Sequence, residues 1–172
     1  MSTELRDTTV VWRPNGGGLN GSGTAHGRGA AIHVQRMAIQ TSKRTEIHDL
    51  TEHVQAVVRE ASVTAGLVTL STMHTTTAVF VNEPQSALLE DVQQLLEHLV
   101  PRGADWKHND PRYSDCDRSN ADAHLRAIML GHSVTLQVAD GALTMGQWQR
   151  ILMAEFDGPR KRNLVLQVLA AA

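Results

Sequence analysis

The pattern of apolar and polar positions predicts a run of short strands and helices beginning at Ile32. Strands are expected where apolar and polar residues alternate or where β-branched residues gather, at 32–41, 67–73, 75–81, 133–138 and 163–169. The dipeptide Asp140–Gly141 is typical of a hairpin turn, so a further strand is expected from Leu143 onward. Strands interspersed with helices, with hairpins late in the chain, predict an α+β fold: a mostly antiparallel sheet with helices packed on one face.

Three segments have the apolar spacing of helices. The first follows Thr51, a good N-cap residue, and the second follows Pro84 and carries a leucine-rich stripe over residues 88–99. Asn120 is expected to cap the third helix, which ends at Gly131. The buried face of this helix is predicted to consist of Leu125, Ile128 and Met129.

Residues 1–30 differ from the rest of the chain because seven glycines fall between Asn15 and Gly29. Such a segment buries little apolar surface and loses much backbone entropy on ordering, which predicts a flexible arm. Within this arm, Arg6 to Arg13 is a candidate for a short added strand. A phosphate-binding loop is not favoured, because no Gly-Lys-Ser/Thr ending follows the glycines. Residues 31–172 are then expected to form a single domain.

Composition narrows the class of protein. The 172 residues carry a formal net charge of −2, which argues against a nucleic-acid-binding protein. Only 3% of the residues are aromatic, so the core must be aliphatic. The single cysteine, Cys116, excludes an intrachain disulfide and suits a reducing compartment. No apolar run is long enough to cross a membrane and no signal-peptide pattern is present, so a cytoplasmic protein without membrane contact is expected.

Three of the nine histidines stand out by their surroundings. His74 precedes three threonines, His108 lies in the long polar segment 102–119, and His124 lies in the first turns of the third helix. Imidazole is a common zinc ligand, and three protein ligands with one open position are typical of a catalytic site. The alternative is that all three are polar residues with ordinary hydrogen bonds, because their spacing matches no short ligand motif.

Charged residues suggest further chemistry. Glu83 ends an apolar strand, where it could simply favour the start of the next helix. Glu155 lies in a strand-like run, and if it points inward it needs a cation or a proton. Arg160 and Arg162 are separated by a single residue, so on a strand they share one face and could hold a phosphate. The alternative is a solvated charge run. Trp148 is a candidate core or interface anchor, or a stacking platform.

Taken together, these residues resemble the YjbQ family, also described as secondary thiamine-phosphate synthases. The resemblance covers roughly residues 33–169 and leaves the glycine-rich arm outside. The matching motifs are His74-Thr-Thr-Thr-Ala, Asn82–Glu83, His108–Asn109, Asn120-Ala-Asp-Ala-His124-Leu, Asp140-Gly-Ala-Leu, Gly146-Gln-Trp148-Gln149 and Glu155-Phe-Asp157-Gly-Pro-Arg160-Lys-Arg162. Each motif is weak alone, but their common order makes the set specific.

The resemblance implies a homotrimer with a polar, metal-binding pocket near a subunit interface. It also implies an activity that joins a pyrimidine pyrophosphate to a thiazole phosphate and releases pyrophosphate. The expected roles are as follows: His74, His108 and His124 bind a divalent ion, zinc or magnesium; Glu155, Asn120 and Glu83 are catalytic; Arg160 and Arg162 bind the phosphate of a small metabolite. The alternative is a trimeric metabolite- or metal-binding protein without turnover.

Overall fold

The structure, a computed structural model, describes residues 23–27 and 30–171. Its elements in chain order are β1 (Gly23–Gly27), β2 (Ala30–Gln40), β3 (Glu46–Asp49), α1 (Thr51–Glu60), β4 (Ala65–Thr72), β5 (Thr77–Asn82), α2 (Ser86–Leu99), the short 3-10 helix η1 (Lys107–Asn109), α3 (Ala121–Leu130), β6 (Ser133–Ala139), β7 (Ala142–Leu143), β8 (Arg150–Glu155) and β9 (Lys161–Ala171). The α+β class expected from the sequence is confirmed.

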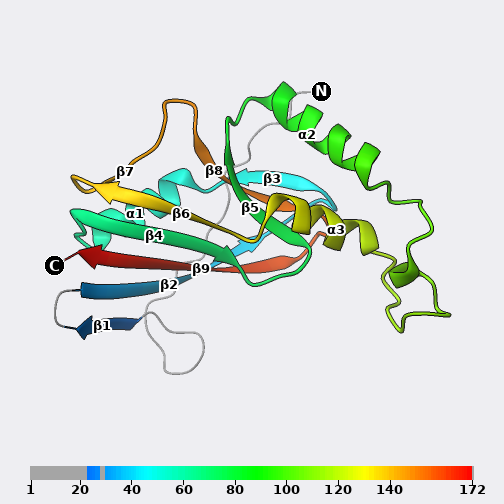
Figure 1. Cartoon of the computed structure of the whole chain (residues 1–172), viewed down its shortest axis with the longest axis horizontal. Coiled ribbons are helices and arrows are strands. Elements are labelled where there is room, and N and C mark those ends of the chain that lie inside the picture. Colours follow the sequence, from blue (N-terminus) through cyan, green and yellow to red (C-terminus); the bar gives the residue numbers. More distant parts are fainter. Residues whose placement is uncertain (1–22, 28–29, 172) are drawn as a thin grey trace.

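The strands form two antiparallel sheets rather than the single sheet expected (Figure 1). The larger sheet has the order β1-β2-β9-β4-β6-β7, and the smaller has the order β3-β8-β5. The longest pairing joins β2 to β9 over all eleven residues of β2, from Ala30–Ala171 to Gln40–Lys161. Consecutive residues are buried over 151–155 of β8 and over 77–79 of β5, so both faces of these stretches are covered.

Strand β8 contributes to two cores because its alternate residues face opposite sides. Ile151 and Met153 join the large core between the two sheets, which α1 also covers. Ala154, with Phe156 just beyond β8, packs in a smaller cluster against α2 and α3. The helices therefore lie on different sides of the small sheet, which corrects the expectation that they share one face of a single sheet. By the same alternation Glu155 points toward the larger sheet.

Helix α3 is oriented differently from the prediction. Ile128 is 76% exposed and Met129 is 51% exposed, whereas Asp122 and Arg126 are buried. Small alanines on the inner face allow close packing against β5 and β8, and both charged residues have partners there. Periodicity located the helix correctly, but its prediction of the buried face was wrong.

Helix starts also differ from expectation. Thr51 is not the N-cap of α1, because Leu50 occupies that position and the Thr51 hydroxyl accepts the Ile151 N–H instead. Asn120 occupies the N-cap position of α3 as expected, but its side chain makes no capping bond; Asn109 Oδ1 accepts the Ala121 N–H there at 2.9 Å instead. Helix α2 begins at Ser86, and of the predicted leucine-rich stripe only Leu89 and Leu96 are buried.

The late hairpin is confirmed, since β6 and β7 pair around Asp140 (φ 51°) and Gly141 (φ 76°). Residues 23–27 of the predicted arm form the edge strand β1, while Arg6 to Arg13 lies outside the described residues. Across the described ranges, none of the helices has both the length and the apolar character needed to cross a bilayer.

Candidate functional site

A polar pocket of about 350 Å³ forms where four segments meet. These segments are the turn between β4 and β5, the loop from α2 to α3, the start of α3, and the turn between β8 and β9. The pocket is lined by Met73, His74, Thr75, Thr76, His108, Cys116, Arg118, Asn120, His124, Asp157, Arg160 and Arg162. It brings together all three predicted histidines, Asn120 and both predicted arginines.

Glu155 and Glu83, two of the predicted catalytic residues, do not line the pocket. Glu83 follows the end of β5. Glu155 is fully buried behind the pocket wall, and its carboxylate accepts hydrogen bonds from Arg162 Nε and Nη2 at 2.5 Å each. The Thr41 hydroxyl and the Asp157 N–H also donate to it, at 3.2 and 2.8 Å. Glu155 therefore holds the wall rather than meeting a ligand in the pocket.

Arg162 occupies a core-facing position of β9, in line with Leu164, Leu166 and Val168. A buried guanidinium requires a counter-ion, and the Glu155 carboxylate supplies it. This agrees with the sequence argument that an inward-facing Glu155 needs a cation or a proton. Arg162 Nη2 also donates to Thr76 Oγ1 at 3.0 Å, which ties the β4–β5 turn to β9. Arg162 is thus mainly committed to structure, although it also lines the pocket.

Asp157 connects several segments of the pocket wall. Its Oδ2 atom accepts from Asn120 Nδ2 at 2.9 Å and lies 2.7 Å from Arg160 Nη2. Its Oδ1 atom accepts from Arg44 Nη1 at 3.2 Å, and Arg44 reaches Asp122 at 3.1 Å as well. Arg44 was missed by the sequence interpretation, because it lies in the loop before β3 with no local motif.

His74 is fixed by the backbone. Its Nε2 atom accepts the Asn163 N–H at 2.7 Å, so a neutral His74 ring carries its proton on Nδ1. Burial lowers the pKa of His74, the Arg162 charge lowers it further, and Glu155 opposes both. In this arrangement neither ring nitrogen of His74 is ready to bind a metal ion.

His124 and His108 lie edge to face, with ring centroids 5.1 Å apart and planes at 84°. Burial lowers the pKa of His124, His108 adds to this effect, and Asp157 and Asp122 oppose it. Two imidazoles bound tetrahedrally to one zinc ion at about 2.1 Å have centroids about 5.4 Å apart, so this pair has a suitable separation. Within the described residues, however, no three His, Cys, Asp or Glu side chains are grouped as a metal site.

The charged residues lining the pocket are three arginines against one aspartate. Arg160 pairs with Asp157 and Arg162 with Glu155, whereas Arg118 is exposed and forms no ion pair with any described residue. Arg118 and Cys116 both lie in the irregular loop from α2 to α3, which is why periodicity gave no signal for them. The pocket therefore presents one uncommitted cation beside a pair of imidazoles.

An apolar groove of about 520 Å³ adjoins the polar pocket. Its lining is Thr72, Met73, His74, Thr75, Thr77, His124, Ala127, Ile128, Gly131 and His132. Four of these residues, Met73, His74, Thr75 and His124, also line the polar pocket. The two depressions thus share a wall at the β4–β5 turn and α3.

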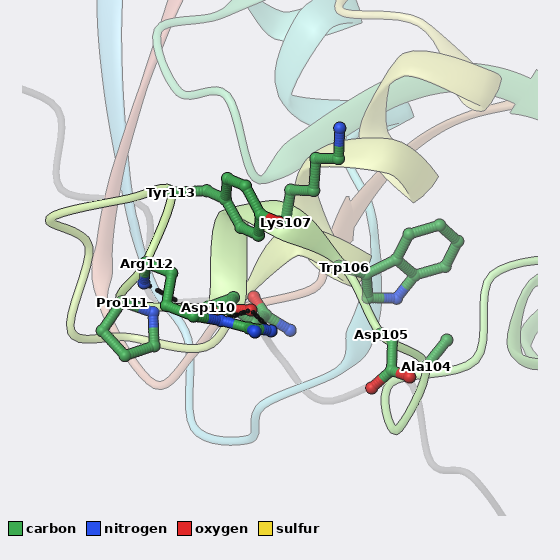
Figure 2. A pocket seen from close by; sticks show the side chains of 9 residues that line it. Ala104, Asp105, Trp106, Lys107, Asp110, Pro111, Arg112 and Tyr113 are labelled. Atoms are coloured by element: carbon green, nitrogen blue, oxygen red, sulfur yellow. Dashed lines mark hydrogen bonds and ion pairs between the residues drawn. The ribbon is translucent and has the colours of Figure 1, made fainter.

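A third depression, the loop cleft, has a volume of about 510 Å³ and is lined only by residues between Ala104 and Tyr113 (Figure 2). Arg112 is paired with Asp110, and Lys107 Nζ lies 5.5 Å from the centre of the Tyr113 ring. None of the predicted site residues lines this cleft. Trp148 lies outside all three depressions and is exposed, which excludes the core-anchor role among the three considered for it.

Comparison with known proteins shows which family the chain is similar to. A family model described as UPF0047 protein YjbQ-like matches residues 35–171. A UPF0047 protein of Archaeoglobus fulgidus is 46% identical over 133 residues, covering 77% of this chain and 98% of the relative. A UPF0047 protein of Methanothermobacter thermautotrophicus is 38% identical over 137 residues, covering 80% of this chain and 92% of the relative.

Solved structures agree with the sequence comparisons. The crystal structure of a YbjQ-like protein of unknown function from Sulfolobus solfataricus has a TM-score of 0.76 and 30% identity, covering 82% of this chain and 99% of that one. A hypothetical protein from Aeropyrum pernix has a TM-score of 0.72 and 35% identity, covering 78% and 96%. By fold and by sequence, this chain belongs to the UPF0047 protein YjbQ-like family.

Proposed function

We propose that the polar pocket binds the phosphate or pyrophosphate group of a small metabolite and that the protein is an enzyme acting on it. The main support is the set of three arginines around one pocket, of which Arg118 has no ion-pair partner among the described residues. Guanidinium groups match phosphate oxygens through forked hydrogen bonds. An arriving phosphate would meet Arg118 first and then compete with Asp157 for Arg160.

The histidines supply the acid–base chemistry of the proposal. Burial lowers the pKa of His124, so its ring is neutral at pH 7 and can accept a proton. His108 lies against it and is the candidate to exchange protons with ligand or solvent. His74 serves as a positioning residue, because the Asn163 N–H fixes its ring. Asn120 orients Asp157 through its amide, and Glu155 holds Arg162.

A thiamine-phosphate synthase-like reaction is compatible with this arrangement. The thiazole nitrogen would form a bond to the pyrimidine methylene carbon while the bond from that carbon to pyrophosphate breaks. The leaving pyrophosphate carries away the electron pair, and nearby cations stabilise its charge. Arg118 and Arg160 are the groups placed to do so. We propose this as a secondary activity of a protein that acts on phosphorylated small molecules.

A divalent ion, zinc or magnesium, is a further part of the proposal. His108 and His124 would hold it, because their separation suits two imidazole ligands of one ion. With the ion bound, these two rings would be ligands instead of acid–base groups, since the nitrogen that binds the metal can no longer accept a proton. His74 would join them only after giving up its bond to Asn163. When bound, the ion would supply additional positive charge for phosphate oxygens.

The second candidate is a trimeric carrier or sensor that binds a metabolite without converting it. It is favoured by the state of the carboxylates around the pocket, since both oxygens of Asp157 and both of Glu155 already have donors. The exposed apolar residues Ile128 and Met129 of α3 are suitable for contact between copies in a trimer.

The proposal is tested by calorimetric titration with inorganic pyrophosphate. Replacing Arg118→Gln is expected to weaken binding about tenfold, since a charge-assisted hydrogen bond is lost. Arg112→Gln, an exposed arginine of the loop cleft, is the matched control and is expected to bind like the wild type. Unchanged affinity in Arg118→Gln, or no binding by the wild type, would contradict the proposal.

Metal and turnover are measured on the same protein. Purified wild type is expected to hold a divalent ion that His124→Ala loses, and equal, negligible metal in both would remove the metal from the proposal. Product formation from a pyrimidine pyrophosphate and a thiazole phosphate then separates enzyme from carrier. Binding without product favours the carrier.

A further inference from the structure

A small cavity between strand β2 and helix α1, the β2 cavity, has a volume of about 140 Å³. Its lining consists of Gln35, Arg36, Met37, His53, Ala56, Val57 and Glu60. None of these residues lines the polar pocket, the apolar groove or the loop cleft. The β2 cavity is therefore a separate place in the molecule, and it plays no part in the function proposed for the polar pocket.

The local fold explains why these side chains meet. The helix residues of the lining have the i, i+3, i+4, i+7 spacing of one helix face: His53, Ala56, Val57 and Glu60. On the other side, the described part of β1 pairs with β2 only as far as Val34. No described strand therefore covers this edge of β2 from Gln35 onward, and the β2 cavity lies beside that stretch.

Two buried nitrogen atoms of the lining lack hydrogen-bond partners. They are Arg36 Nε and His53 Nδ1, and among the described residues they are the only buried side-chain nitrogen or oxygen atoms without a partner. Buried polar side-chain atoms nearly always have a partner, either in the protein or in something bound to it. Both exceptions line the same cavity, which indicates that this cavity accommodates a hydrogen-bonding group.

The charges of the lining select the kind of group. The Arg36 guanidinium is always protonated, and it forms no ion pair with any described residue. Its Nε–H can only donate, and His53 Nδ1 donates when it carries a proton. Glu60 is the one carboxylate of the lining, and it is exposed to solvent. A partly buried cation without a counter-ion favours an acceptor that carries negative charge.

We propose that the β2 cavity is a second anion site, which binds a small oxyanion of either tetrahedral or carboxylate form. One oxygen of the anion accepts the Arg36 Nε–H, and another accepts a proton-bearing His53 Nδ1. The volume fits this class of ligand, because metabolite pockets usually measure about 300–1,000 Å³, whereas one water needs only about 10–15 Å³. At about 140 Å³, the cavity suits an ion of a few heavy atoms.

The test follows the histidine ring signals of the full chain by nuclear magnetic resonance at constant pH. Sodium sulfate and sodium acetate are added in separate titrations, each against sodium chloride of the same ionic strength. His53 signals, assigned with His53→Gln, are expected to move and saturate with a dissociation constant of about 1–30 mM, as for one charge-assisted and one ordinary hydrogen bond. Whichever anion binds more tightly distinguishes the tetrahedral from the carboxylate ligand.

Matched variants assign the effect to the β2 cavity. Arg36→Gln is expected to weaken binding at least tenfold, because a charged donor is lost. Arg118→Gln changes the polar pocket instead and is expected to leave the His53 titration unchanged. Glu60→Gln removes a repelling charge and is expected to tighten binding about two- to fivefold. Glu52→Gln, exposed on the same helix but outside the lining, is its control.

The outcomes that overturn the proposal are distinct. His53 signals that respond to neither oxyanion more than to chloride would leave the cavity to water alone. An equal response in Arg36→Gln and wild type, or a response that Arg118→Gln abolishes, would place the binding elsewhere. If Arg36→Gln fails to fold, the exposed Glu60→Gln decides, and an affinity equal to that of Glu52→Gln then overturns the proposal. Pyrophosphate binding at the polar pocket is measured separately and does not depend on these results.

Discussion

The polar pocket and the loop cleft differ in the origin of their walls. The cleft is the larger, at about 510 Å³ against about 350 Å³, yet all its lining residues fall between Ala104 and Tyr113. The polar pocket draws on four segments that are distant in sequence, tied together by Asp157 and Arg162. The larger volume therefore does not by itself make the cleft the better candidate site. Groups held from several directions keep a fixed geometry, whereas one loop can change shape as a whole.

The largest difference between the two regions is expected when the polar pocket loses Glu155, the buried carboxylate that pairs with Arg162. Glu155→Gln leaves the Arg162 charge buried without its counter-ion and is expected to lower the free energy of unfolding by about 3–5 kcal/mol, measured by urea denaturation. Asp110→Asn, which removes the exposed ion pair of the loop cleft, is the control and should leave the urea midpoint unchanged. Similar midpoints for the two variants would show that the wall does not depend on this ion pair.

A smaller effect is expected from Asn120→Ala. The change leaves one donor missing at the buried Asp157 and is expected to cost about 1–3 kcal/mol in unfolding free energy. It should also weaken pyrophosphate binding, because Arg160 then faces a less restrained carboxylate. The measurement is urea denaturation together with titration. A stability loss without any change in affinity would place Asn120 in the fold alone.

The loop cleft is expected to respond differently. Asn109→Ala removes the bond to the Ala121 N–H at the start of α3 and is expected to cost about 1 kcal/mol, as other lost helix caps do. Pyrophosphate affinity should remain close to that of the wild type, since Asn109 does not line the polar pocket. An affinity loss as large as that of Arg118→Gln would show that the two depressions act as one site.

The smallest expected effect is a pH dependence from the pocket histidines. Burial lowers the pKa of His74 and of His124 in the folded protein below the ordinary histidine value of about 6.5, so the unfolded chain binds protons first as pH falls. Stability is therefore expected to decrease as pH drops through about 6.5 and to level off below the folded-state pKa values. Melting temperatures across this range should fall less steeply for His124→Gln. Parallel curves for variant and wild type would contradict this assignment.

The sequence predicted the α+β class and the late hairpin because those features depend on local alternation and on Asp140–Gly141. It could not predict the buried face of α3, where small alanines pack more closely than Ile128 could. Apolar spacing measures what a helix could bury, and the neighbouring surface decides which face fits. The small sheet was also missed as a separate layer, because strand periodicity contains no information on which strands pair.

In the candidate site, too, some features could be predicted from the sequence and others could not. Glu155 could be recognised as needing a cation, because a carboxylate within an apolar strand demands one. Their surroundings single out His74, His108 and His124, whereas their assignment to one metal site comes from the family resemblance rather than from spacing. Arg44 could not have been found, because its two aspartate partners come from α3 and from the turn after β8. Ion pairs between distant segments leave no pattern along the chain.

The place of β9 in the larger sheet has a consequence for the order of folding. This strand, residues 161–171, lies between β2 and β4 and pairs with both. During synthesis β2 and β4 leave the ribosome long before β9, which pairs with both. The backbone N–H and C=O groups on the edges that face β9 therefore stay unpaired until β9 is available. Contacts between such distant residues slow folding and prolong the exposure of unpaired strand edges. Because β9 also carries Arg162, the polar pocket and the sheet are completed by the same late event.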